Sequence, residues 1–137
     1  GKTKHFQTLI LSPSVMLCDC PGLVFPTFMR SRAEMVVNAV LPIDQMRDHR
    51  EPMQLIVARI PRSVMEAHYG ITIDLLPDEN PAMPPDASRV VQAYSRARGF
   101  MASRHAGPDE PRGARLILKD FVGGALPYCH PPPALKE

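Results

Sequence analysis

One short stretch limits what this chain can fold into more than any other, an apolar run that ends in an aspartate and a glycine. Val15 to Cys18 is apolar on both faces, which is typical of a fully buried strand, and Asp19-Cys20-Pro21-Gly22 follows it. A strand that ends in Asp-x-x-Gly presents a carboxylate and a backbone N–H group at one spot. Such a pair can hold Mg²⁺ and contact a nucleotide γ-phosphate, whereas an ordinary strand-to-turn junction is the alternative interpretation.

The residues before this run predict a second strand. From His5 to Leu11 they alternate between two faces, and Ser12-Pro13-Ser14 predicts a tight turn. Gly1-Lys2-Thr3 resembles the end of a phosphate-binding P-loop, G-x-x-x-x-G-K-[ST]. A P-loop continues at once into a helix that binds the phosphates, so the strand after Thr3 argues against this interpretation.

The order of these features is that of a nucleotide switch. A loop with Thr3 is followed by a strand, a turn, a strand and Asp-x-x-Gly. In P-loop GTPases, switch I, two antiparallel strands and switch II follow one another in this order. A threonine of switch I there ligates Mg²⁺ through its hydroxyl, while the aspartate holds the water shell of the ion. Thr3 and Asp19 fit these two roles, and a solvated loop residue is the alternative for Thr3.

After Arg30 the pattern changes to helices separated by proline and glycine, and 16 of the 137 residues are proline. A capping box of Ser31 and Glu34 begins the first helix, Pro42 ends it, and residues 74–85 form a loop. No further strand is expected. The predicted helix starts are Ser31, Pro52, Pro61, Asp86 and Asp109. The predicted inward-facing residues are Ala33, Val36, Val37 and Val40, then Met53, Ile56, Val57 and Ile60, then Val90, Ala93, Tyr94 and Ala97, and finally Ala114, Ile117, Leu118 and Phe121.

These patterns predict an α/β piece followed by an all-α domain. Residues 1–30 are expected to contribute two antiparallel strands of a P-loop GTPase sheet together with switch II, and residues 31–137 a helical domain. The chain opens on Gly1 without an initiator Met, so we expect a fragment of a longer protein.

Composition and cysteine spacing exclude several classes. No apolar run approaches the roughly 20 residues of a membrane span, so no membrane partner is expected. Three cysteines, an odd number, do not form a disulfide framework and indicate a reducing compartment. A zinc site built from Cys18, Cys20, Cys129 and His130 is disfavoured, because the close cysteine pair lacks the usual spacer of two or more residues.

The guanine-specificity motif is missing where an ordinary GTPase has it. Asn/Thr-Lys-x-Asp normally follows Asp-x-x-Gly along the chain, and no residue after Gly22 supplies it. Either the protein has no guanine site, or the order of the motifs is permuted and the site lies upstream.

Several segments together have the pattern of one family. They are Gly1-Lys2-Thr3-Lys4-His5-Phe6-Gln7-Thr8, Leu17-Cys18-Asp19-Cys20-Pro21-Gly22-Leu23, Leu41-Pro42-Ile43-Asp44-Gln45-Met46-Arg47-Asp48, Arg98-Gly99-Phe100-Met101, and Leu118-Lys119-Asp120 with Cys129-His130-Pro131-Pro132-Pro133. On these segments the chain resembles the circularly permuted GTPases of the YlqF type, and most closely the eukaryotic large-subunit GTPase 1 family of ribosome assembly factors.

The resemblance implies the C-terminal part of a GTPase that binds GTP with Mg²⁺ and whose P-loop and guanine-specificity motif lie before Gly1. Thr3 is then the switch I threonine and a ligand of Mg²⁺, while Asp19, Pro21 and Gly22 form switch II. The family resemblance also implies a late cytoplasmic step in maturation of the large (60S) ribosomal subunit, coupled to release of an export adaptor. Alone, the fragment is expected to bind GTP poorly and to be inactive.

Leu23 bears on hydrolysis. Ras-like GTPases place a glutamine directly after the switch II glycine to orient the attacking water, and leucine has no donor or acceptor for that task. The catalytic residue therefore stays unassigned, and we expect slow intrinsic turnover.

The last helix carries a basic stripe. Arg112, Arg115 and Lys119 fall at i, i+3 and i+7, on the side opposite Ile117 and Phe121. Such a stripe can lie along phosphates, although spacing alone equally fits a solvated helix face. The resemblance favours ribosomal RNA. The alternative function is a non-catalytic helical module that binds RNA or protein.

Overall fold

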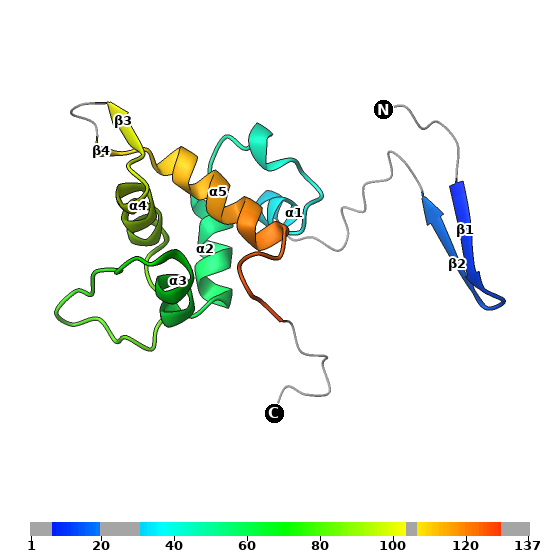
Figure 1. Cartoon of the computed structure of the whole chain (residues 1–137), viewed down its shortest axis with the longest axis horizontal. Coiled ribbons are helices and arrows are strands. Elements are labelled where there is room, and N and C mark those ends of the chain that lie inside the picture. Colours follow the sequence, from blue (N-terminus) through cyan, green and yellow to red (C-terminus); the bar gives the residue numbers. More distant parts are fainter. Residues whose placement is uncertain (1–6, 20–30, 104–106, 130–137) are drawn as a thin grey trace. The chain divides into compact units, whose positions relative to one another are not determined.

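The computed structural model describes residues 7–19, 31–103 and 107–129 (Figure 1). Its contacts divide the chain into two compact units, residues 1–30 and residues 31–137, which are described separately below. The first contains a β-ribbon and the second is mainly helical.

The ribbon consists of β1 (Gln7–Ser12) and β2 (Val15–Asp19), paired antiparallel across the turn at residues 13–14. Both predicted strands and the turn between them are confirmed. Gln7 pairs with Asp19 at the open end, and the register shifts between Ile10 and Ser12. A shift of this kind is a β-bulge, which increases the local twist of a ribbon.

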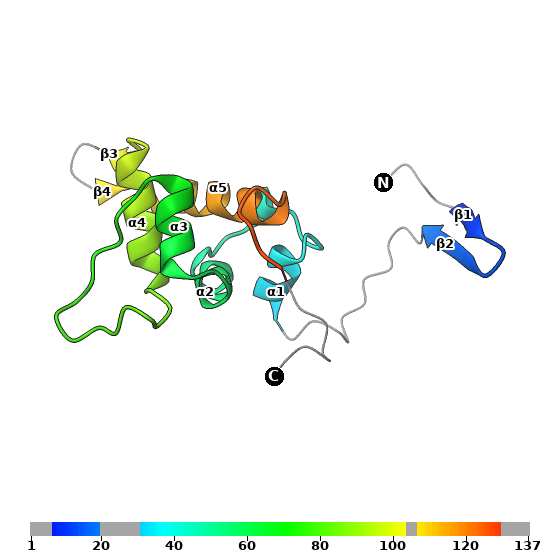
Figure 2. The ribbon, with the colours of Figure 1, turned by 60° about the horizontal axis from the view of Figure 1, so that its bottom comes forward.

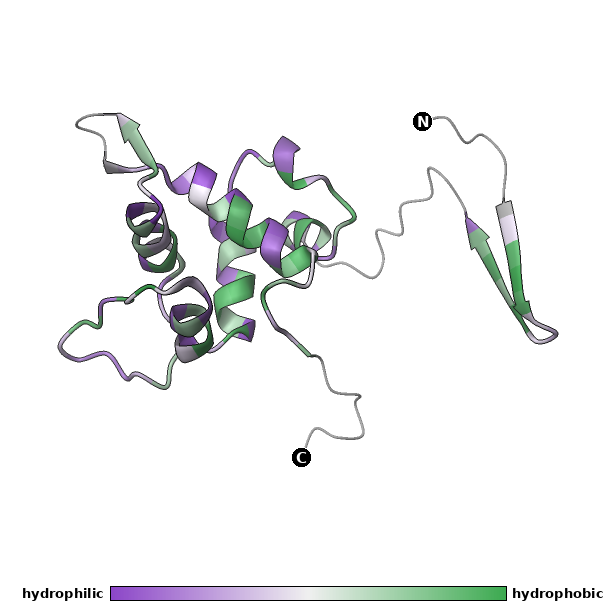
Figure 3. Ribbon diagram, viewed as in Figure 1, coloured by the Kyte–Doolittle hydropathy of each residue, from purple (hydrophilic) through white to green (hydrophobic). Residues whose placement is uncertain are grey.

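The prediction that the second strand is fully buried is wrong for this structure, because β2 is exposed along its whole length. Most of the ribbon is coloured hydrophobic in Figure 3, and because successive residues of a strand point to opposite faces, apolar side chains lie on both faces. Within residues 7–19 there are only two strands and no further layer to cover either face. An apolar pattern on both faces indicates a strand suited to burial between two layers. The strand is buried only where those layers are present.

The second unit contains five α-helices and one 3₁₀ turn among its described residues (Figures 1 and 2). Helix α2 contacts α1, α4 and α5, and the core gathers around these contacts. The predicted helices are confirmed. Their bounds are α1 (Arg32–Val37), η1 (Ile43–Gln45), α2 (Arg50–Arg59), α3 (Arg62–Tyr69), α4 (Ala87–Ala97) and α5 (Glu110–Val122).

Three helix starts follow the capping residues read from the sequence, whereas α2 begins at Arg50, two residues before the predicted Pro52. Ser31 Oγ accepts the backbone N–H of Glu34 at 3.2 Å. In the same way, Asp86 and Asp109 each accept an N–H of the first turn of their helix, at 3.2 and 3.1 Å. Each cap of this kind contributes about 1 kcal/mol to the stability of the fold.

The end of α1 differs from the prediction. The helix stops at Val37 rather than continuing to Pro42, and Val40 is exposed instead of inward-facing. Ala39 adopts a positive φ of 61°, and the N–H of Val40 returns to the carbonyl of Met35 at 2.8 Å. This left-handed C-terminal cap reverses the chain before the proline is reached.

The inward face of α4 also differs in part. Val90 and Tyr94 are buried as predicted, but Ala97 is exposed and Ser95 is fully buried. The cause is Gly113 on α5, since a Cβ at that position would lie 2.2 Å from Ser95 Oγ. Without a side chain at Gly113, α5 lies directly on the polar side of α4. The Ser95 hydroxyl donates to the carbonyl of Asp109 at 3.1 Å.

The prediction of no further strand is wrong as well. A short hairpin, β3 (Met101–Ser103) with β4 (Gly107–Pro108), connects α4 to α5. Strands of three and two residues are too short to produce a readable alternation, which explains why the sequence pattern did not reveal them.

The predicted loop over 74–85 is confirmed and is held by one carboxylate. Arg62 and Arg89 each donate to Glu79 Oε1 at 3.0 Å, and the N–H of Leu76 donates to its Oε2 at 3.1 Å. The hydrogen bonds from Arg89 and then from Leu76 lower the pKa of Glu79 to about 2. This ion network ties the loop to α3 and α4.

Candidate functional site

Asp19 is the one predicted nucleotide-binding residue that the structure describes. It is the last residue of β2, lies exposed, and pairs with Gln7 at the end of the ribbon away from the turn. Thr3, Pro21 and Gly22 lie outside the described residues, as does Leu23. The structure therefore gives the position of one carboxylate, Asp19, and the pairing of β1 with β2 next to it.

The exposed Asp19 carboxylate has the chemistry that Mg²⁺ prefers. This ion is typically bound by one or two carboxylates together with waters and substrate phosphates, rather than by a cage made only of protein groups. In the described part of the chain, no three His, Cys, Asp or Glu side chains gather into a group that could hold a metal. A single exposed carboxylate is the kind of ligand that a protein gives to such an ion.

The described residues give no support to a zinc site. The side chain of Cys18 is exposed and not buried as the sequence pattern predicts, and Cys129 is also exposed. Cys20 and His130 lie outside the described residues, so the complete set is not placed.

The basic stripe lies on the outer side of α5, away from its buried residues Gly113, Ala114, Ile117 and Leu118. Its three cations have different surroundings. Lys119 Nζ lies 2.7 Å from Asp44 Oδ1, so a carboxylate already compensates its charge. The guanidinium carbon of Arg112 lies 4.1 Å from the centre of the Phe100 ring. Arg115 is half-buried.

The sequence did not reveal that aromatic rings stack against two arginines of this region. Besides Arg112 on Phe100, the guanidinium carbon of Arg98 lies 5.5 Å from the centre of the Tyr94 ring. A signal was present in Arg98-Gly99-Phe100, since glycine directly after a helix end predicts a chain reversal. That reversal returns Phe100 towards α5.

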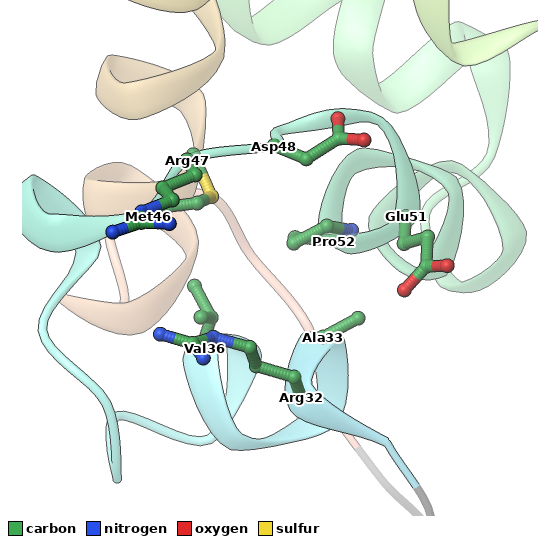
Figure 4. Close-up of a pocket in the computed structure, with 8 residues that line it drawn as sticks. All are labelled: Arg32, Ala33, Val36, Met46, Arg47, Asp48, Glu51 and Pro52. Carbon is green, nitrogen blue, oxygen red and sulfur yellow. The ribbon is translucent and has the colours of Figure 1, made fainter.

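A pocket of about 200 Å³ lies between α1 and the segment that leads into α2. Figure 4 shows the guanidinium groups of Arg32 and Arg47 on one side and the carboxylates of Asp48 and Glu51 on the other. The lining residues between these charges are apolar: Ala33, Val36, Met46 and Pro52. None of the residues that line it carries a thiol, hydroxyl or imidazole, and its polar groups are these two guanidinium groups and two carboxylates.

None of the helices in the described residues is long and apolar enough to cross a bilayer.

Comparison with known proteins finds relatives that match nearly the whole chain. The chain is 56% identical over 135 residues to "Large subunit GTPase 1 homolog" of Mus musculus, a match that covers 97% of this chain and 21% of that protein. This chain is a relative of large subunit GTPase 1. The human protein of the same name is also 56% identical, over 97% of this chain and 20% of its own length. "GTPase LSG1-2" of Arabidopsis thaliana is 49% identical over 100% of this chain and 23% of its own length. No protein-family model matches the chain.

The resemblance to the large-subunit GTPase 1 family read from the sequence segments is therefore confirmed. The chain spans about a fifth of the length of the large subunit GTPase 1 relatives that it matches. The match covers nearly all of the chain, so the ribbon and the helical unit both lie within it.

Proposed function

We propose that this chain is part of a GTP-binding and GTP-hydrolysing switch protein of the large subunit GTPase 1 type, with permuted motif order and its phosphate loop and guanine site outside these residues. Two observations support the proposal. The relatives that match nearly the whole chain carry the name of a GTPase. The ribbon that precedes the Asp-x-x-Gly sequence carries Asp19 at its open end.

In this proposal Thr3, Asp19, Pro21 and Gly22 hold the nucleotide, and Thr3 and Asp19 hold Mg²⁺. The β1–β2 register supports the pairing of these two groups, because Gln7 lies opposite Asp19 and Thr3 precedes Gln7 by four residues. Four residues span at most about 14 Å, which keeps Thr3 within reach of the same end of the ribbon. The ion supplies positive charge beside the phosphates when it is bound.

The exposed apolar ribbon also supports this assignment. Leu9, Ile10, Met16 and Leu17 are each more than half exposed, at 61, 68, 60 and 53%. Leu9 pairs with Leu17 and Ile10 pairs with Met16, so each face of the ribbon carries an apolar pair. Strands of this kind belong inside a sheet covered by helices on both faces, which is the architecture of an α/β nucleotide-binding domain.

Hydrolysis depends on a group that these residues do not identify. Leu23 occupies the position next to the switch II glycine and cannot orient water. We expect intrinsic turnover to be slow and to rise when a partner supplies the missing group.

The helical unit is proposed to dock on the large (60S) ribosomal subunit during a late cytoplasmic maturation step, coupled to release of an export adaptor. The names of the mouse and human relatives refer to a large subunit. The arginines on the outer side of α4 and α5 support contact with a polyanion.

A chimera tests the proposed nucleotide switch. In the mouse relative, this chain replaces the segment that it matches, and binding of a fluorescent GTP analogue is measured with Mg²⁺. The proposal expects binding comparable to that of the intact mouse protein and slow hydrolysis of GTP. A folded chimera that binds no GTP analogue would refute the switch function and leave the non-catalytic helical module as the better account.

A further inference from the structure

Four side chains of the helical unit form a continuous series in which each one contacts the next. Arg98 lies over the Tyr94 ring at 5.5 Å, the Tyr94 and Phe100 rings meet edge to face at 6.3 Å, and Arg112 lies over Phe100 at 4.1 Å. We call these residues the arginine–aromatic cluster. It brings together two arginines from different helices, α5 and the C-terminal end of α4.

The end of α4 builds this cluster. Gly99 adopts a φ of 69°, and its N–H returns to the carbonyl of Arg96 at 3.1 Å. The N–H of Phe100 bonds the carbonyl of Ser95 at 2.8 Å, which completes a Schellman cap. The carbonyl of Phe100 then accepts the N–H of Asp109 at 2.9 Å. Phe100 is thereby fixed beside the first turn of α5, where Arg112 covers its ring.

The arginines of the cluster have no acidic partner in the part of the chain that the structure describes. The ion pairs found there use other cations, namely His49, Arg62, Arg89 and Lys119. Arg115, one turn beyond Arg112 on α5, has no ion pair in the same residues either. Arg98, Arg112 and Arg115 thus lack a carboxylate at ion-pair distance among the described residues.

A guanidinium stacked on a ring keeps its N–H edge free. The aromatic face removes rotamer freedom from the long side chain, and the planar edge still presents two parallel donors to an oxyanion. Carboxylate and phosphate are the groups whose geometry such a fork matches. The cluster is therefore suited to bind successive phosphates rather than to neutralise a single charge.

We propose that the arginine–aromatic cluster, together with Arg115, binds the phosphate backbone of RNA, and that Phe100 is the positioning residue for Arg112. The choice of RNA among polyanions rests on the proposed docking on a ribosomal subunit. The cluster differs from the stripe read from the sequence: it adds Arg98 and Phe100. It leaves out Lys119, whose ammonium group Asp44 already compensates.

Binding of the full 137-residue chain to a fluorescein-labelled RNA duplex of 20 base pairs tests the proposal, measured by anisotropy over a range of salt concentrations. Arg112→Gln should weaken binding about five- to tenfold and reduce the salt slope by about one. Arg112→Lys keeps the charge but loses the fork and the stacking, so it should rescue only part of the affinity. Phe100→Leu should weaken binding about two- to fivefold although it removes no charge.

Two controls separate this surface from general positive charge. Arg47→Ala removes an exposed arginine outside the cluster and should change affinity less than twofold, as should Lys119→Ala. Asp44→Asn should strengthen binding, because it frees the ammonium of Lys119. Unchanged circular dichroism shows that each variant is folded.

Equal losses from Arg112→Gln and Arg47→Ala would overturn the proposal, as would normal affinity of Phe100→Leu. Competition by polyglutamate as effective as by unlabelled RNA would also overturn it, since the surface would then bind any polyanion. Failure of RNA binding in a chimera that still binds the GTP analogue would refute the cluster alone. Loss of GTP-analogue binding with RNA binding intact would refute the switch and not the cluster.

Discussion

The contact between Gly113 and Ser95 gives a stability prediction whose sign depends on the partner residue. In Gly113→Ala, the new Cβ would lie 2.2 Å from Ser95 Oγ, so the hydroxyl must move. That hydroxyl is fully buried and donates to the carbonyl of Asp109. Displacing it combines overpacking with the loss of a buried hydrogen bond, a cost of about 2 kcal/mol. Replacing glycine inside a helix returns about 1 kcal/mol, so Gly113→Ala should destabilise the fold by about 1 kcal/mol.

The same substitution should have the opposite sign in a Ser95→Ala background. Without the hydroxyl, the remaining neighbours of the new Cβ are the Val91 carbonyl at 3.4 Å and the Cβ of residue 95 at 3.5 Å, which are ordinary contacts. Only the gain in helix propensity then remains, and Gly113→Ala should stabilise the Ser95→Ala variant by up to about 1 kcal/mol. The two effects differ by about 2 kcal/mol. This coupling energy is well above the deviation from additivity that independent sites show.

Urea unfolding of the four proteins of this cycle, followed by circular dichroism at 222 nm, measures the coupling. Gly113→Ala with the same effect in both backgrounds would refute the reasoning, because the Ser95 hydroxyl would then not limit the approach of α5 to α4.

Two further predictions concern the helical unit. Ala39→Gly should raise the free energy of unfolding by about 1 kcal/mol, because residue 39 holds a φ of 61° that costs an L side chain and not glycine; an unchanged urea midpoint would contradict this. Glu79 has its pKa lowered to about 2, below its value of about 4.3 in an unfolded chain, so its contribution to stability is present above about pH 4 and is lost as the pH falls towards 2. The stability of the wild type should therefore fall more steeply between pH 5 and pH 2 than that of Glu79→Gln, and parallel profiles would exclude the ion network as the cause.

The helices were predictable because most of their ends are set by residues close by in the sequence. Ser31, Asp86 and Asp109 cap the chain through side chains that act within one turn, and Gly70 ends α3 in the left-handed conformation that glycine accepts. Ala39 reaches the same conformation without the residue that signals it, so the early end of α1 could not be read from the sequence.

What the sequence did not reveal depends on contacts between elements. The burial of Ser95 follows from Gly113 on another helix, and the position of Arg112 follows from Phe100, which returns at a glycine turn. Lys119 fits the basic stripe by spacing, but Asp44, 75 residues earlier, compensates its charge. The spacing of residues in the sequence predicts which of them share a helix face, whereas the residues that this face contacts depend on the fold.

Asp19, at the open end of the ribbon, is proposed to hold the magnesium ion of a bound guanine nucleotide. A Mg²⁺ titration tests it most directly, with the mouse chimera and a fluorescent GTP analogue at fixed concentration. Asp19→Ala should raise the Mg²⁺ concentration for half-maximal binding at least tenfold, while Asp78→Ala, an exposed aspartate of the loop over 74–85, should leave it unchanged. Identical Mg²⁺ curves for the unsubstituted chimera and its Asp19→Ala variant would contradict the claim.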